Sequence, residues 1–176
     1  MSSIKHFIFL TIYYGFAQYL PPSYNRILGS FSKWLRYQCC LRLFKECGCN
    51  VNIERKAYFG TGSMICIGDN SGLGINCVIP NGSIIGKDVM MGPNCFIHST
   101  NHNFDRVDIP MNQQGESEAL PVIIGDDVWI GQNVTIMRGR KIESGSIIAA
   151  NCVLTKDFPP YSIVGGNPSK LIKTRK

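Results

Sequence analysis

The chain of 176 residues is long enough for one principal domain, and its 44% hydrophobic residues are enough to form a buried core. Its net charge of +6 comes from 18 basic and 12 acidic residues, with the surplus mainly near the two ends, which suggests an anionic partner near a terminus. No recognised nucleic-acid-binding motif accompanies this charge, so a phosphorylated cofactor is a better explanation than a nucleic acid.

Residues 1–48 are predicted to form a helical segment. An apolar and aromatic run over residues 6–20 ends at Pro21 and Pro22, and a second helix is expected from about residue 24 to residue 45. The first run contains polar residues and is shorter than the roughly 20 residues that cross a bilayer. We therefore expect a helix packed on the protein, with peripheral membrane contact through this helix as the alternative.

Residues 49–166 carry a six-residue repeat. An aliphatic residue recurs at every sixth position, and the position after it is usually small. The aliphatic positions are Ile67, Leu73, Ile79, Ile85, Met91 and Ile97, and then Ile124, Ile130, Ile136, Ile142, Ile148 and Leu154. This period fits coils of three short parallel strands with about eighteen residues per turn, rather than a helix or a plain alternating strand. The prediction is a mainly β fold, a parallel β-helix of about five coils.

The eight cysteines do not indicate a disulfide framework. Cys77, Cys95 and Cys152 occupy the small-residue position four after the aliphatic one, so packing explains them better than metal binding or catalysis. We recognise no cleavable signal sequence, and we therefore expect reduced thiols and a cytoplasmic protein.

Two segments interrupt or follow the repeat. Residues 103–121 form a polar loop inserted between coils, and a long loop in a regular solenoid is usually functional. Residues 167–176 are predicted to be a basic C-terminal tail.

Several motifs make the chain resemble the hexapeptide-repeat acetyltransferases, especially the maltose, galactoside and capsule-type sugar O-acetyltransferases. They are Asn101-His102-Asn103-Phe104 at the start of the loop, the run over residues 121–131, and the runs over residues 153–160 and 165–173. The resemblance covers residues 67–173 and implies that the β-helix is left-handed, which the repeat period alone does not determine. It also implies acetyl-CoA as co-substrate, no metal, and a homotrimer with a site in each groove between neighbouring solenoids.

The same resemblance assigns roles to individual residues. It implies that His102 is a general base that takes the proton of an acceptor hydroxyl as the oxygen attacks the thioester. A loop-turn cap is the structural alternative for this residue. The implied cofactor-binding residues are Trp129, Gly131, Gln132, Ala150, Thr155, Lys156, Lys170 and Lys173. Packing under the loop is the alternative for Trp129, and a solvated tail position is the alternative for Lys173.

The implied acceptor-binding residues are Asn76, Asn81 and Asn101. Maltose and galactoside enzymes carry aspartate where this chain has Asn81. We therefore expect an acceptor other than free maltose or galactoside, such as a glycan intermediate of polysaccharide biosynthesis.

Three other functions stay open. His98 and His102 together suggest a zinc enzyme, but such a site requires a third ligand, and no third histidine lies in the repeat region. Acetylation of an amine, on an amino sugar or an antibiotic, is a second alternative. A catalytically inactive solenoid that serves as an assembly module is the third, and it predicts no affinity for coenzyme A.

Overall fold

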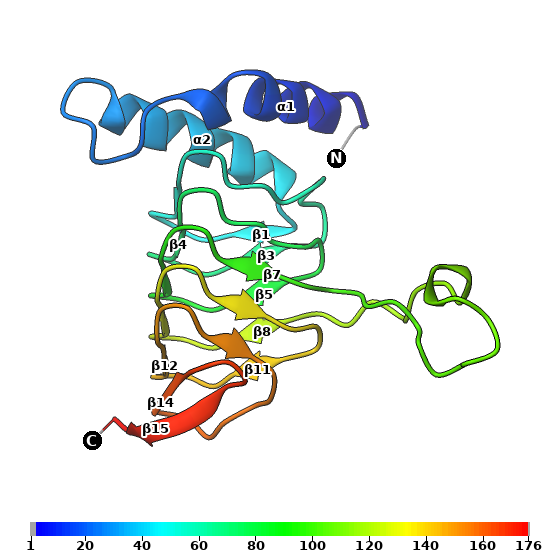
Figure 1. Cartoon of the computed structure of the whole chain (residues 1–176). Helices are drawn as coiled ribbons and strands as arrows, with labels where there is room; N and C mark the ends of the chain where they lie inside the picture. Colours follow the sequence, from blue (N-terminus) through cyan, green and yellow to red (C-terminus); the bar gives the residue numbers. More distant parts are fainter. Residues whose placement is uncertain (1–2, 176) are drawn as a thin grey trace.

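The structure of the chain, a computed structural model, describes residues 3–175. Two helices lie across one end of a stack of short strands, and a long loop leaves the stack on one side (Figure 1). The helices are α1 (Ser3–Gly15) and α2 (Gly29–Leu43), with the 3-10 helix η1 (Ala17–Tyr19) after α1. None of the helices in this part of the chain has the length and apolar character needed to cross a membrane.

The stack of strands has three faces, to which successive coils contribute strands in turn. The first face contains β1 (Glu46–Cys47), β3 (Cys66–Ile67), β5 (Ile84–Ile85), β8 (Ile123–Ile124) and β11 (Lys141–Ile142). The second contains β2 (Asn52–Ile53), β4 (Gly72–Leu73), β6 (Met90–Met91), β9 (Trp129–Ile130), β12 (Ile147–Ile148) and β14 (Ser162–Gly165), closed by the antiparallel β15 (Lys170–Thr174). The third contains β7 (Phe96–Ile97), β10 (Thr135–Ile136) and β13 (Val153–Leu154). The mainly β, repeat-built fold predicted from the six-residue period is confirmed.

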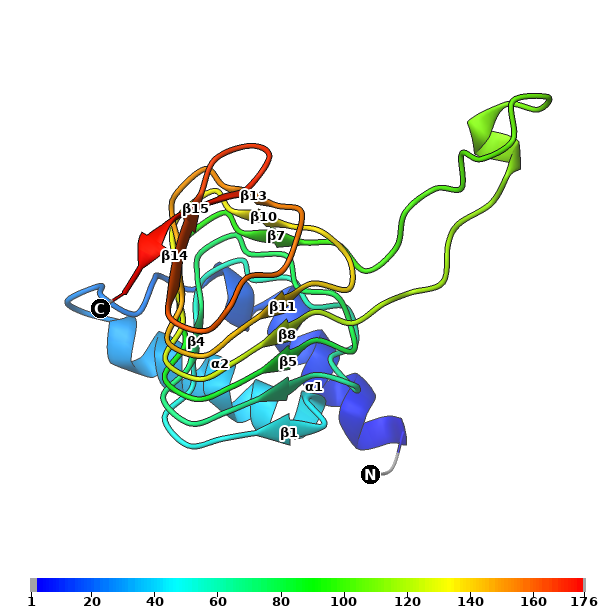
Figure 2. The same ribbon diagram turned by 90° about the horizontal axis from the view of Figure 1, so that it is seen from below.

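The register of the strands explains that period. Ile67 pairs with Ile85, one coil of eighteen residues later, and Ile85 pairs with Ile124 across the inserted loop. All three side chains are buried in the interior of the stack, whereas the preceding residue of each strand faces outward. Seen from its C-terminal end, the chain turns clockwise as it approaches the viewer, which is the left-handed sense (Figure 2). Parallel strands stacked at about 4.8 Å thus share one continuous apolar core.

Asparagines hold one corner of the stack, where the chain passes from the second face to the third. Each adopts the left-handed conformation with φ near +57°, which asparagine tolerates better than most residues. Their amides form a ladder in which Asn76 donates to Asn94, Asn94 to Asn133 and Asn133 to Asn151, at 3.0–3.1 Å. Asn76, predicted to contact the acceptor, is therefore the first rung of this ladder.

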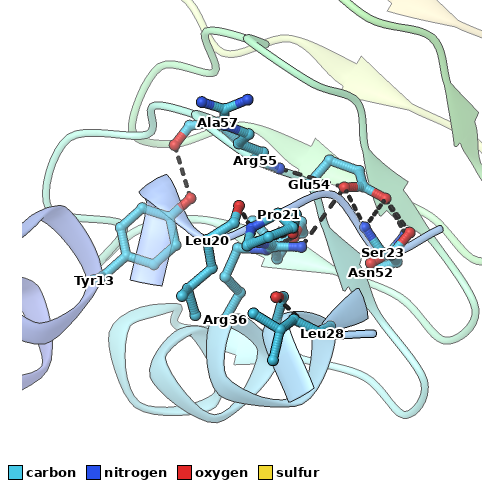
Figure 3. Close-up of polar contacts among 12 residues, drawn as sticks. Tyr13, Leu20, Pro21, Ser23, Leu28, Arg36, Asn52, Glu54, Arg55 and Ala57 are labelled. Carbon is cyan, nitrogen blue, oxygen red and sulfur yellow. Dashed lines mark hydrogen bonds and ion pairs between the residues drawn. The ribbon is translucent and has the colours of Figure 1, made fainter. Parts of the chain in front are cut away.

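A buried polar network fastens the helices to the first coil (Figure 3). Arg36 of α2 is fully buried and donates to the carbonyl oxygens of Pro21 and Ile53, and its Nη2 lies 3.6 Å from Glu54 Oε2. Tyr13 of α1 donates its hydroxyl to the Ala57 carbonyl at 2.7 Å. The helical segment is therefore docked on the solenoid through specific polar contacts as well as through apolar packing.

The cysteines at the solenoid corners serve as small packing residues. Cys77, Cys95 and Cys152 are buried and none of them forms a disulfide. The sulfur of Cys95 lies 3.1 Å from the carbonyl oxygen of Gly131 on the next coil. Their positions agree with the packing interpretation of the repeat.

Candidate active site

A cavity of about 660 Å³ lies on the second face, at the edge where the chain turns toward the third face. Its size is within the range of small-molecule binding sites. Four predicted cofactor residues line it together, namely Trp129, Gly131, Gln132 and Ala150. The three residues Gly131, Ala149 and Ala150 leave little side chain over the backbone at this edge, so an extended ligand can approach the chain closely.

Trp129 forms one wall of this cavity. It occupies the outward-facing first position of β9, between Met90 of β6 and Ile147 of β12 in the parallel register. Its side chain is 52% exposed, whereas Ile130 beside it is fully buried in the core. The inserted loop leaves the solenoid at a different corner, so the indole lies on an open face and not beneath that loop.

Sequence reasoning did not single out Ile147, Ile163, Gly92 and Pro93, which also line the cavity. Ile147 follows Trp129 by eighteen residues, which is one coil. The repeat period could therefore have identified it, because outward-facing residues one coil apart stack on the same face.

The other predicted cofactor residues lie apart from this cavity or at its rim. Lys173 of β15 pairs with Ile163, a cavity residue, and Lys170 pairs with Gly165. Thr155 and Lys156 follow β13, at the corner between the third and first faces. The Thr155 N–H donates to Ser169 Oγ at 3.1 Å, which ties this corner to the C-terminal segment.

His102 lies in the inserted loop, close to where the loop leaves the solenoid. The loop begins as a narrow two-stranded stem, in which His102 forms a bridge with Glu116 and the Asn103 N–H donates to the Gly115 carbonyl at 3.0 Å. The Asn101 N–H donates to Ser117 Oγ at 3.0 Å, which holds the same stem from the other side. His102 itself is exposed. The backbone contacts of the stem thus hold His102 at an exposed position.

A second cavity, of about 320 Å³, lies on the third face at the foot of the loop. Asn81 and His98 line it, and the His98 ring lies 4.6 Å from the ring of Phe96. The Asn81 carboxamide oxygen accepts the Met64 N–H at 2.8 Å. Asn81 and Asn101 are thus both near the foot of the loop, whereas the Asn76 ladder is at another corner.

Within residues 3–175, no three histidine, cysteine, aspartate or glutamate side chains are grouped as metal ligands would be. His98 and His102 therefore have no third ligand beside them in this part of the chain.

The two halves of the candidate site lie on different sides of one chain. The cavity with Trp129 opens on the second face and its edge, whereas the loop with His102 leaves from the corner between the third and first faces (Figure 2). The loop extends away from its own solenoid, so it does not fold back over that cavity. A single copy of the chain does not bring the imidazole and the cavity together.

Known proteins resemble this chain in sequence and in structure. The family model described as "Bacterial transferase hexapeptide (six repeats)" matches residues 121–156. A putative acetyltransferase of Saccharomyces cerevisiae is 39% identical over 138 residues, which are 77% of this chain and 69% of the yeast protein. The galactoside O-acetyltransferase of Escherichia coli is 35% identical over 133 residues, which are 74% of this chain and 64% of that protein. A solved galactoside acetyltransferase in complex with coenzyme A superposes with a TM-score of 0.79 at 29% identity, over 98% of this chain and 81% of that chain.

Proposed function

The chain belongs to the hexapeptide-repeat acetyltransferase family, and from this membership we propose that it transfers an acetyl group from acetyl-CoA to a hydroxyl of a sugar or glycan intermediate. His102 is the general base in this proposal, and the working unit is a homotrimer that acts in polysaccharide biosynthesis. The observation that carries the proposal is the cavity in which Trp129, Gly131, Gln132 and Ala150 come together.

The chemistry of this cavity suits the extended arm of coenzyme A. Its walls are the indole of Trp129 and the outward isoleucines, and its edge is backbone with little side chain over it. An apolar arm with amide groups can lie along such an edge and bond to backbone groups. Lys173 and Lys170 lie on the strand beside the cavity, and in this proposal they bind the phosphate end, since lysine binds phosphate as a point charge.

The proposed role of His102 is proton transfer. Its neutral imidazole accepts the proton of the acceptor hydroxyl while the hydroxyl oxygen forms a bond to the acetyl carbon. The bond from that carbon to sulfur then breaks, and the imidazolium returns the proton to the departing thiolate. No acetyl-enzyme is required, because the oxygen and the thioester meet directly.

The separation of the two halves on one chain supports a shared site. The loop reaches away from its own solenoid, toward space that a neighbouring copy can occupy (Figure 2). In a cyclic trimer every interface is identical, so His102 of each chain meets the cavity of the next and three equivalent sites result. The acceptor then binds between the two chains, near the foot of the loop where Asn81 and Asn101 lie.

The test is acetyl-CoA turnover, followed by thiol release, against a panel of sugars and matched amino sugars. We expect His102→Ala to lower the rate by about 10²- to 10⁴-fold, the usual contribution of a general base. His6→Ala is the matched control, because His6 lies in the helical segment and contacts the Thr61 carbonyl at 3.1 Å. An unchanged rate in His102→Ala removes this residue from the mechanism.

Two further results would favour one of the alternative functions over acetylation of a hydroxyl. Faster turnover of amines than of hydroxyls would make the protein an N-acetyltransferase. No thermal shift with coenzyme A would favour the inactive assembly module.

A further inference from the structure

One end of the protein, the N-terminal layer of residues 3–45, comprises both helices and the segments around them and carries a net charge of +6. The six basic residues of this layer are Lys5, Arg26, Lys33, Arg36, Arg42 and Lys45, and it contains no aspartate or glutamate. The rest of the chain carries 12 basic and 12 acidic residues and is therefore neutral overall. Basic residues at the C-terminal end are offset by acidic residues of the solenoid, whereas the N-terminal layer has no acidic residue of its own.

Most of these cations have no acidic partner. Arg36 faces Glu54 at 3.6 Å, but none of the other five appears in an ion pair within residues 3–175. Lys33 donates to the Asn50 side chain at 3.1 Å, which leaves its charge uncompensated. The N-terminal layer therefore presents a positive field to whatever approaches this end of the molecule.

The outer side of α1 is apolar. Tyr13 is fully buried against the solenoid, whereas Ile4, Phe7 and Ile8 are 72%, 69% and 48% exposed. Residues three or four apart on a helix share a face, so these three form one stripe, which continues to Thr11. This stripe lies on the side of α1 opposite the buried Tyr13, and at its edge Phe7 also lines a groove with Thr61 and Ser63 of the first coil.

The segment before α2 and the outer side of α2 continue this apolar character. Ile27, Leu28, Phe31 and Trp34 are all exposed, with Trp34 at 54%, and the rings of Phe31 and Trp34 lie 6.0 Å apart. The opposite side of α2 contains the buried Arg36, Cys40 and Leu43, which pack on α1 and the first coil. α1 and α2 pack side by side across the same end of the solenoid (Figure 1). Because each stripe lies opposite the buried side of its helix, we infer that the two stripes belong to one outer surface.

We propose that this outer surface of the N-terminal layer docks the protein on an anionic lipid bilayer. Exposed aromatic and aliphatic side chains enter the interface between lipid headgroups and acyl chains, and the surrounding cations bind the lipid phosphates. α1 has 13 residues and lies flat across the solenoid, which suits a helix in the plane of the interface and not one that spans it.

A groove beside the stripe adds a place for a lipid headgroup. It has a volume of about 600 Å³, and its lining combines Phe7 and Leu10 with Arg42 and Lys45. Apolar side chains next to two cations match the amphipathic boundary of an anionic phospholipid. Phe7 belongs both to the groove and to the apolar stripe, so a bound headgroup would lie close to the stripe.

Charge decides between a bilayer and a second copy of the chain as the occupant. Two N-terminal layers, each with five cations that have no acidic partner within residues 3–175, repel when they meet face to face, whereas an anionic bilayer attracts this surface. The proposal does not depend on catalysis, because it concerns the end of the solenoid and not the cavity with Trp129.

The experiment is co-sedimentation of the full chain with vesicles of phosphatidylcholine alone and with vesicles that also contain phosphatidylglycerol. We expect binding to the anionic vesicles only, and weaker binding as salt is added. Each cation near the surface contributes about fivefold, so the triple variant Lys5→Gln, Arg26→Gln, Lys33→Gln should bind about 100-fold more weakly. Lys87→Gln, an exposed cation on the solenoid, is the matched control and should bind like the wild type.

Fluorescence gives a second readout of the same proposal. In the Trp129→Phe background, the emission of Trp34 should shift to shorter wavelength when anionic vesicles are added. The double variant Phe7→Ser, Ile8→Ser should lose vesicle binding while its circular dichroism stays that of the wild type. No sedimentation with anionic vesicles at low salt overturns the proposal. The proposal is also overturned if the double variant Phe7→Ser, Ile8→Ser loses self-association but still binds the vesicles.

Discussion

Replacement of Arg36 by methionine tests how the helices are held on the solenoid. Arg36 is fully buried, and Glu54, its ion-pair partner at 3.6 Å, has a side chain only 12% exposed. Removal of one member of a buried ion pair costs about 3–5 kcal/mol, because the remaining charge is left without a partner in a poorly solvated place. Glu54 keeps hydrogen bonds from the Ser23 and Asn52 nitrogens, both at 3.1 Å, so we expect the lower end, about 3 kcal/mol.

The loss should be confined at first to the helical segment. Trp34 of α2 and Trp129 of β9 are the two tryptophans of the chain, so Trp129→Phe leaves a fluorophore in the N-terminal layer alone. In urea, Arg36→Met should shift the Trp34 transition to lower denaturant than the loss of β circular dichroism. The protein concentration is kept fixed, because association changes apparent stability.

Arg26→Met is the matched control for this measurement. Arg26 belongs to the same layer but is exposed and takes part in none of the ion pairs of residues 3–175, so its loss should change stability by less than about 0.5 kcal/mol. If Arg36→Met costs no more than Arg26→Met, the buried network does not hold the layer and the reasoning is wrong.

Two other predictions concern acid stability and the close stacking of the coils. Burial raises the pKa of Glu54, but hydrogen bonds from Ser23 and Asn52 and the charge of Arg36 together outweigh it and hold the pKa below its ordinary value of 4.5. Ionised Glu54 therefore stabilises the folded protein fully above its ordinary pKa, and this stabilisation is lost as pH falls through the lowered pKa. Glu54→Gln should accordingly abolish an acid transition of Trp34 fluorescence below about pH 4.5. A Cβ on Gly131 would lie 2.6 Å from a backbone nitrogen of the next coil, so Gly131→Val should displace the cavity edge and weaken coenzyme A binding in calorimetry. Gly15→Ala, with open space around it, should leave that affinity unchanged.

The fold could be predicted from the sequence because one position in six must fill the same narrow interior. Ile67, Ile85 and Ile124 are aliphatic for that reason, and the structure pairs them in successive coils. Handedness could not be derived in the same way, since the period of a coil is the same for either hand. It followed from the family resemblance, and the structure is left-handed (Figure 2).

The candidate site could be predicted only where its residues follow the period. Gln132 and Ala150 are eighteen residues apart and meet at the same edge, so coil geometry brings them together. Lys156 belongs to another corner, and no local pattern relates it to that cavity. The pairing of Arg36 with Glu54 was also beyond sequence reasoning, because it depends on how a helix docks on a coil and not on spacing along the chain.

The sequence also could not distinguish a ladder residue from a binding residue at Asn76. Its amide donates to Asn94 at 3.0 Å and its backbone is in the left-handed region, so the corner itself requires an asparagine there. A contact with the acceptor remains a prediction for Asn76 that competes with this structural role.

The central claim is that each catalytic centre combines His102 of one chain with the cavity of another, and subunit complementation tests it most directly. His102→Ala removes the base, and Ala150→Trp fills the cavity, so each homomeric variant should be inactive. The two variants are co-expressed with different tags, and assemblies that carry both are purified. In a cyclic trimer with both chain types, one interface joins an intact His102 to an intact cavity, so we expect about one third of the wild-type turnover. Mixed assemblies as inactive as their parents would show that His102 does not act on the cavity of a neighbouring chain, and would contradict the account.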